Sequence, residues 1–387
     1  GMKRSTERIL TTHTGSLPRP AELVDMLHRR DEGQDIQQSA VDARVRAAVA
    51  EVVAKQCDAG VDVINDGEQG KIAYSVYVKD RLSGFDGEEP TQMPALDDDF
   101  PEYSKRLQQA EALILHSSIK RPVCTGPIGW KDHQAVQKDI DKLKAALNGF
   151  DPEDVFMTAA SPGVVSGFLQ DRYYGSEEAY VYALADALKV EYDAVFRAGF
   201  LLQVDCPDLT MSGLRRRQHA GHSQEDFIKK AELHVEALNH AVRDIPPDRM
   251  RLHLCWGNYE GPHHLDTPLE DIIGIAFKAR PSALSFEASN PRHGHEWKLF
   301  KEVKLPEGKL LIPGVLDSTT NFIEHPELVQ QRIVQYASLV GRENVIAGAD
   351  CGFAHFASST PRIDPRIAWA KLAALADGAH LASEELW

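Results

Sequence analysis

Four residues in the second half of the chain have the side-chain chemistry of a metal site. His253 and Cys255 stand two positions apart, and Glu287 and Cys351 follow at intervals that match one and two strand-helix units. Together they offer one imidazole, one carboxylate and two thiolates. This donor set suits Zn²⁺, which prefers nitrogen and sulfur ligands with an occasional carboxylate in a tetrahedral arrangement.

Each of these residue types also has an ordinary structural role. A lone buried cysteine usually packs as a small hydrophobic side chain, and a histidine at a strand end often only satisfies hydrogen bonds. Residue types and spacing alone therefore leave a zinc site and a purely structural set of buried side chains both open.

A recurring pattern of helix, glycine and strand predicts the fold that must position these residues. Residues 41–59 place apolar side chains at helical spacing, Gly60 can cap the helix, and residues 61–66 read as a strand. The same plan recurs at 177–198 and at 327–340. Helices that alternate with strands predict a parallel sheet.

Further apolar runs raise the number of predicted strands to eight. These runs are residues 9–16, 154–163, 251–258, 283–290 and 309–317. Eight such units predict an α/β fold with a single (β/α)₈ TIM barrel, and no G-x-G-x-x-G or P-loop sequence supports a nucleotide-binding sheet. Residues 86–104 read as an acidic insertion after the second strand, and 120–128 could form an extra strand. No linker divides the chain, so residues 1–387 are predicted to form one domain.

The composition limits the classes of partner that the protein can bind. The chain has 43 Lys and Arg against 58 Asp and Glu, a formal charge of −15, which argues against the nucleic-acid backbone as a partner. No stretch approaches the roughly 18 consecutive apolar residues of a membrane span, and the N-terminus has no apolar signal core. Five widely spaced cysteines do not make a disulfide framework. We therefore expect a cytoplasmic protein that acts on small molecules.

In a barrel of this type the reactive groups lie at the carboxyl ends of the strands. Residues i and i+2 on a strand point to the same face, so His253 and Cys255 are predicted to face the barrel mouth together. The polar residues at the predicted strand ends are His13, Gly15, Ser16, Asp66, Glu68, Asp205, Asp208, His253, Cys255, Glu287, Asp317, Asp350 and Cys351.

Seven short motifs carry a resemblance to a known family. They are TTHTGSLPRP (11–20), DGEQGK (66–71), VDCPDL (204–209), HLCWGN (253–258), FEAS (286–289), IPGVLD (312–317) and GADCGF (348–353). In this order they resemble the catalytic half of cobalamin-independent methionine synthase, and above all its short single-barrel relatives, which include zinc-dependent alkyltransferases acting on coenzyme M. Uroporphyrinogen decarboxylase shares the barrel but has no such zinc set.

The resemblance implies a role for each matching residue. Gly15 and Ser16 match the loop that contacts the substrate amino acid, and Glu68 and Asp205 match the acids that hold its ammonium group. The zinc ligands that it implies are His253, Cys255, Glu287 and Cys351.

Two departures concern the methyl donor and the general acid. The full-length family members carry a second, N-terminal barrel that helps to bind the folate, and this sequence has no counterpart. After the seventh strand, Thr319 stands where the family has a His thought to be the general acid, which leaves Asp317 and His13 as the predicted catalytic residues. The arginine triplet at 215–217 is a candidate clamp for a carboxylate or sulfonate.

The resemblance therefore implies a zinc-dependent S-methyltransferase, which activates a thiol such as homocysteine for attack on a methyl donor. Three alternatives stay open. The first is a transferase that adds an epoxide-derived alkyl group to coenzyme M. The second is a zinc-free decarboxylase-like barrel, and the third is a zinc-dependent protein that binds a thiol without turnover.

Overall fold

A parallel sheet forms the centre of the molecule. The computed structural model describes residues 1–89, 99–114, 121–211 and 223–387. Seven strands pair in the order β1-β4-β5-β6-β7-β8-β9, and every pair is parallel. The strands are β1 (Val63–Ile64), β4 (Asp154–Ala160), β5 (Leu201–Asp205), β6 (Met250–Leu254), β7 (Ala283–Phe286), β8 (Leu310–Leu316) and β9 (Gly348–Ala349).

The segment before β1 connects the two edges of this sheet. On one side the Thr12 N–H donates to the Ala347 carbonyl at 2.8 Å, and the Ala347 N–H donates to the Leu10 carbonyl at 2.9 Å. On the other side the Val63 N–H donates to the Thr11 carbonyl at 3.0 Å. The curled sheet with this bridge fits a TIM-type barrel.

Seven of the eight predicted strands are confirmed as strands, and the first, 9–16, is present only as this bridge. Beyond Thr12 its polar groups bond across the sheet instead of along a neighbouring strand, since the Gln203 amide donates to the Thr14 carbonyl at 2.6 Å. The pattern of helix and capping glycine is also confirmed. Gly60 and Gly199 have φ values of 85° and 90°, which a side chain would strain.

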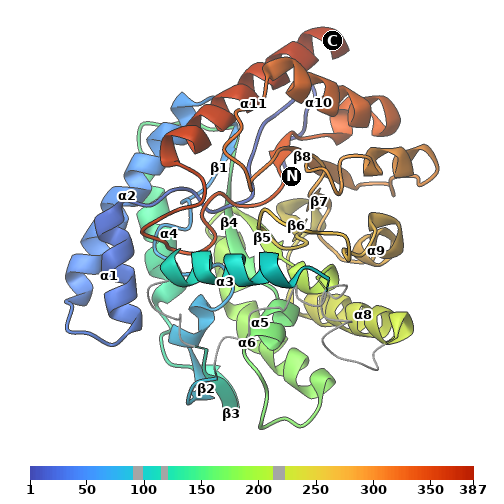
Figure 1. The fold of residues 1–387 in the computed structure, drawn as a ribbon. Coiled ribbons are helices and arrows are strands. Elements are labelled where there is room, and N and C mark those ends of the chain that lie inside the picture. Colours follow the sequence, from blue (N-terminus) through green and yellow to red (C-terminus); the bar gives the residue numbers. More distant parts are fainter. Residues whose placement is uncertain (90–98, 115–120, 212–222) are drawn as a thin grey trace.

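Helices surround the central sheet (Figure 1). Their apolar faces and the outer face of the sheet form the main hydrophobic core. They are α1 (Ala21–Asp31), α2 (Gln38–Asp58), α3 (Pro101–Ile114), α4 (Ala135–Ala146), α5 (Pro162–Phe168), α6 (Glu177–Arg197), α8 (Gln224–Ala241), α9 (Leu269–Ala276), α10 (Pro326–Val340) and α11 (Pro365–Leu386).

A two-stranded ribbon stands apart from the parallel sheet. Strand β2 (Leu82–Asp86) pairs antiparallel with β3 (Val123–Trp130), and this confirms an extra strand in the region of 120–128.

Half of the predicted acidic insertion, residues 90–98, lies outside the described residues, as does the arginine triplet at 215–217.

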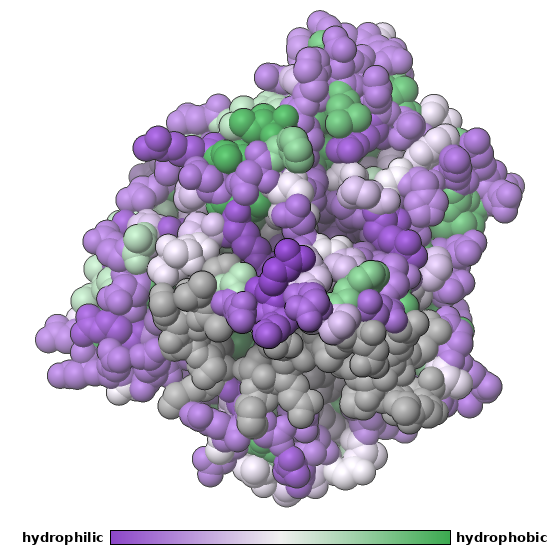
Figure 2. Space-filling view, viewed as in Figure 1, coloured by the Kyte–Doolittle hydropathy of each residue, from purple (hydrophilic) through white to green (hydrophobic). Residues whose placement is uncertain are grey.

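The face shown in Figure 2 is mainly hydrophilic, with small separate hydrophobic areas. Among the helices of the described ranges, none is both long enough and apolar enough to cross a lipid bilayer.

Candidate metal centre and substrate pocket

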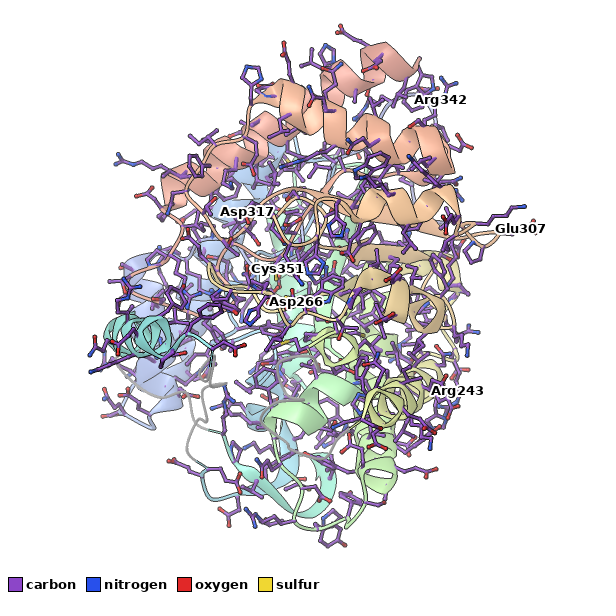
Figure 3. All side chains as sticks on the ribbon, turned by 45° about the vertical axis from the view of Figure 1, so that its right-hand side comes forward. Arg243, Asp266, Glu307, Asp317, Arg342 and Cys351 are labelled. Carbon is purple, nitrogen blue, oxygen red and sulfur yellow. The ribbon has the colours of Figure 1, made fainter. Side chains whose placement is uncertain are left out.

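Three of the four predicted zinc ligands come together at the carboxyl ends of the strands. His253, Cys255 and Cys351 each place one ligand atom within 4.8 Å of the other two, and all three side chains are buried. They come from the end of β6 and from the turn after β9, which are far apart in the sequence. Cys351 lies toward the middle of the molecule in Figure 3, whereas Arg342 lies at its edge.

The imidazole of His253 is held in an orientation that leaves one ring nitrogen for a metal ion. Its Nδ1 lies 2.8 Å from the Ser285 hydroxyl of the neighbouring strand, because strand register pairs the two residues. Its Nε2 is buried without any hydrogen-bond partner in the described structure. Burial and the charge of Arg251 lower the pKa of His253 to about 3, so the ring is neutral, as a metal ligand must be.

The two cysteines face each other as free thiols. Their Sγ atoms are 3.3 Å apart, well beyond the roughly 2.05 Å of a disulfide bond. The Gly257 N–H donates to Cys255 Sγ at 3.4 Å. The hydrogen bond to Cys351 and burial raise the pKa of the Cys255 thiol, and a bound cation would reverse this effect.

Glu287, the fourth predicted ligand, lies beside this group of three. Its Oε2 accepts a 2.6 Å hydrogen bond from the N–H of Trp256, the residue after Cys255. Asp350 holds the loop that carries Glu287, because its carboxylate accepts the N–H groups of Ser289 and Asn290 at 3.0 Å each. Burial and the neighbouring Cys255 raise the pKa of Glu287.

A second buried cluster contains the two acids predicted to hold an ammonium group. Glu68 is the one non-glycine residue with a positive φ, 55°, among the described residues, and its Oε1 has no hydrogen-bond partner there. Burial and the negative charge of Glu68 raise the pKa of Asp205 to about 8. Burial also raises the pKa of Glu68, although the positive charges of Lys71 and Arg19 oppose this rise. A cation that approaches the two carboxylates would favour their charged forms. The positive φ of Glu68 is a strained backbone conformation, and such strain is typical of functional sites.

Gly15 and Ser16 border this acidic pair. A Cβ on Gly15 would overlap the Glu68 carboxylate, so the close approach requires glycine. The Ser16 hydroxyl accepts the Ala354 N–H at 3.1 Å. The loop of Gly15 and Ser16 is therefore joined to the loop that follows Cys351.

Both predicted catalytic residues have their hydrogen-bonding groups engaged. His13 Nε2 lies 2.7 Å from the Gln56 amide oxygen, its Nδ1 accepts the Gly15 N–H, and burial lowers its pKa to about 4. The Asp317 carboxylate accepts hydrogen bonds from the N–H and hydroxyl of both Thr319 and Thr320. In this arrangement the side chains of His13 and Asp317 stabilise the loops that carry them, and their catalytic role stays a prediction.

Two residues at the site escaped the sequence reasoning. Asn258 and His355 form a hydrogen bond between the loops after β6 and β9. The available signals were that Asn258 ends the motif of Cys255 and that His355 lies two residues after the motif of Cys351.

The sequence is similar to methionine synthases over nearly its whole length. No family model matches the sequence. The methionine synthase of Thermococcus kodakarensis is 24% identical over 377 residues, which cover 97% of this chain and 94% of that protein. The methionine synthase of Sulfurisphaera tokodaii is 24% identical over 383 residues, with 97% and 93% covered. The resemblance to methionine synthases is confirmed.

A solved structure shows the same fold. The B12-independent methionine synthase from Shewanella, solved in complex with selenomethionine, superposes with a TM-score of 0.73 at 18% identity. The match covers 98% of this chain and 99% of that one. The two chains therefore share their fold over nearly their whole lengths.

Proposed function

We propose that this protein is a zinc-dependent S-methyltransferase of one barrel domain that transfers a methyl group to an amino acid thiol such as homocysteine. The observation that carries the proposal is the buried group of His253, Cys255 and Cys351, whose imidazole leaves Nε2 unpaired. Relatives that match this chain over nearly their whole length are named methionine synthases, which agrees with the proposal.

The residues present fit a zinc ion. His253 is neutral and held by Ser285, and two thiols stand at contact distance from each other. Glu287 is the candidate for a fourth ligand, since it is anchored on the residue next to Cys255. A zinc ion held there would keep a substrate thiol deprotonated at neutral pH, where a free thiol with a pKa of about 8.5 is mostly protonated.

The protein side chains bind and orient the substrate. Glu68 and Asp205 attract the ammonium group of an amino acid, and the Ser16 loop borders the same pocket. A sulfonate such as coenzyme M would meet two carboxylates here, so the acidic pair favours an amino acid over that alternative. Fixing the acceptor in line with the methyl donor supplies much of the rate.

The first experiment is the zinc content of the purified wild-type protein, measured by elemental mass spectrometry beside Cys255→Ser and Cys351→Ser. Cys206→Ser is the matched control, because Cys206 is equally buried but lies outside the group. We expect about one zinc per chain in the wild type and the control, and strong loss in both other variants. A wild type that carries no zinc and takes none up would overturn the proposal and favour the decarboxylase-like reaction.

The second experiment tests the acceptor. Calorimetry on the zinc-loaded protein compares homocysteine with 4-mercaptobutyrate, which lacks the ammonium group. A charged hydrogen bond contributes about 1.5–3 kcal/mol, so we expect roughly a 10- to 100-fold preference for homocysteine that Glu68→Gln abolishes. Equal affinities in the wild type would contradict the role of the acidic pair.

A further inference from the structure

Asn258 fixes the protonation state of His355. Its Nδ2 donates to the Gly352 carbonyl at 2.7 Å and lies 3.1 Å from His355 Nδ1. Its Oδ1 accepts the Ser318 hydroxyl at 2.9 Å. The Gly352 carbonyl allows only the amide nitrogen to face it, so both amide hydrogens point toward Gly352 and His355. An amide nitrogen can only donate, and His355 Nδ1 must therefore be the acceptor.

The ring of His355 is consequently neutral, with its hydrogen on Nε2. Burial and the positive charges of Arg362 and Arg19 lower the pKa of His355 to about 3. No hydrogen-bond partner faces Nε2 within the described ranges, and the residue is half-buried. The site thus holds a fixed N–H donor that cannot act as an acid at neutral pH.

His355 lies beside the residues of the proposed substrate pocket. Its ring packs edge-on against Tyr74, with centroids 6.1 Å apart. The preceding residue, Ala354, bonds to the Ser16 hydroxyl. Arg19 links the two halves of the pocket, because it donates to the Glu68 carbonyl at 2.9 Å and to the Ala354 carbonyl at 2.6 Å.

The residues around His355 therefore include groups for both ends of an amino acid. The carboxylates of Glu68 and Asp205 suit an ammonium group, and the Nε2–H of His355 suits a carboxylate. Arg19 joins the loops that carry these groups, because it donates to the carbonyls of Glu68 and Ala354.

We propose that His355 is a substrate-binding residue that donates its Nε2–H to the carboxylate of the amino acid thiol, with Asn258 as the positioning residue that holds the required tautomer. This inference rests on the proposed function. It names a hydrogen-bond donor and not a proton donor, so no proton leaves the ring during the reaction.

The test compares homocysteine with its methyl ester, which lacks the carboxylate charge, by calorimetry on zinc-loaded protein. His355→Leu is expected to weaken homocysteine binding about 10- to 100-fold and to leave the ester unchanged. His355→Gln should stay within a few-fold of the wild type, because its amide Nε2 can stand in for the imidazole Nε2–H. Zinc content in each variant reports that the barrel has folded.

A positioning variant provides a second, independent measurement. Asn258→Asp presents a carboxylate to Nδ1 of His355, so it should move the ring hydrogen to Nδ1. The variant should then lose the preference for homocysteine over its methyl ester, although His355 is intact. Nitrogen-15 NMR of labelled histidine, with the His355 signals assigned by their absence in His355→Gln, should show a neutral Nε2–H ring in the wild type from pH 6 to 8.

Several results would overturn the inference: an imidazolium at pH 7, equal losses in the Leu and Gln variants, or an equal loss for homocysteine and its ester. An unchanged homocysteine affinity in His355→Leu would also overturn it. These readouts need no methyl transfer. A protein that binds homocysteine as predicted but transfers no methyl group would therefore contradict only the proposed function.

Discussion

The buried side chain of His293, which packs on Trp256 beside the candidate metal centre, predicts a specific dependence of stability on pH. His293 has only 3% of its side chain exposed and lies between two carboxylates. Its Nε2 is 2.7 Å from Asp266, and its Nδ1 meets Glu296. The ring is tilted over Trp256 with centroids 4.2 Å apart. Replacing it with Gln keeps a polar side chain but removes the positive charge.

The magnitude follows from the shift in pKa. Burial alone would lower the pKa of His293, but the hydrogen bonds to Asp266 and Glu296 outweigh it and raise the pKa from 6.5 to about 9. Each tenfold change in a protonation equilibrium corresponds to about 1.4 kcal/mol, so the rise corresponds to roughly 3 kcal/mol. Because the pKa is higher in the folded state, this stabilisation is complete below about pH 6.5 and is lost as the pH rises through 9.

Equilibrium urea unfolding of zinc-loaded wild type and His293→Gln, followed by tryptophan fluorescence between pH 6 and 9.5, measures this term. The difference in unfolding free energy between the two proteins should shrink by roughly 3 kcal/mol over this range. His380→Gln is the control, since that side chain is 74% exposed, and its difference from wild type should stay flat. A constant difference for His293→Gln at all pH values would refute the reasoning.

Further substitutions test packing at two glycines and one buried ion pair. A Cβ on Gly163 would overlap His234 and its ion-pair partner, so Gly163→Ala should destabilise the fold by about 1–3 kcal/mol in urea unfolding. Gly274→Ala, which meets open space in a helix, should stabilise by about 0.5–1 kcal/mol; similar values for both would show that the predicted overlap is relieved without cost. Lys371, fully buried, donates to Glu324 at 2.7 Å, so Lys371→Met should cost about 3–5 kcal/mol by leaving a buried charge unpaired. Adding Glu324→Gln should recover part of that loss, and a fully additive double variant would contradict the pairing.

Much of the fold could be predicted from the sequence because its signals are local. Helical spacing, a glycine at the helix end and a following apolar run all lie within a few turns of one another, as at residues 41–66. The first strand could not be predicted correctly in the same way. Its pairing depends on Ala347 and Val63, which belong to opposite edges of the sheet.

The candidate site divides along the same line. Residue types and strand ends predicted a zinc site, and the tertiary structure brings the ligand atoms of His253, Cys255 and Cys351 within 4.8 Å of one another. The sequence could not show that the Glu287 carboxylate accepts the Trp256 N–H, or that the hydrogen-bonding groups of His13 are already engaged.

What the sequence by itself determined was the inventory of groups: strand-end acids, thiols and imidazoles in the order of a barrel. Only the tertiary structure decided their protonation and their free hydrogen-bonding positions. The reason is physical, because a buried group's pKa and tautomer depend on neighbours that are distant in the chain. Asn258 and His355 are 97 residues apart, yet the amide of one determines which nitrogen of the other carries the hydrogen.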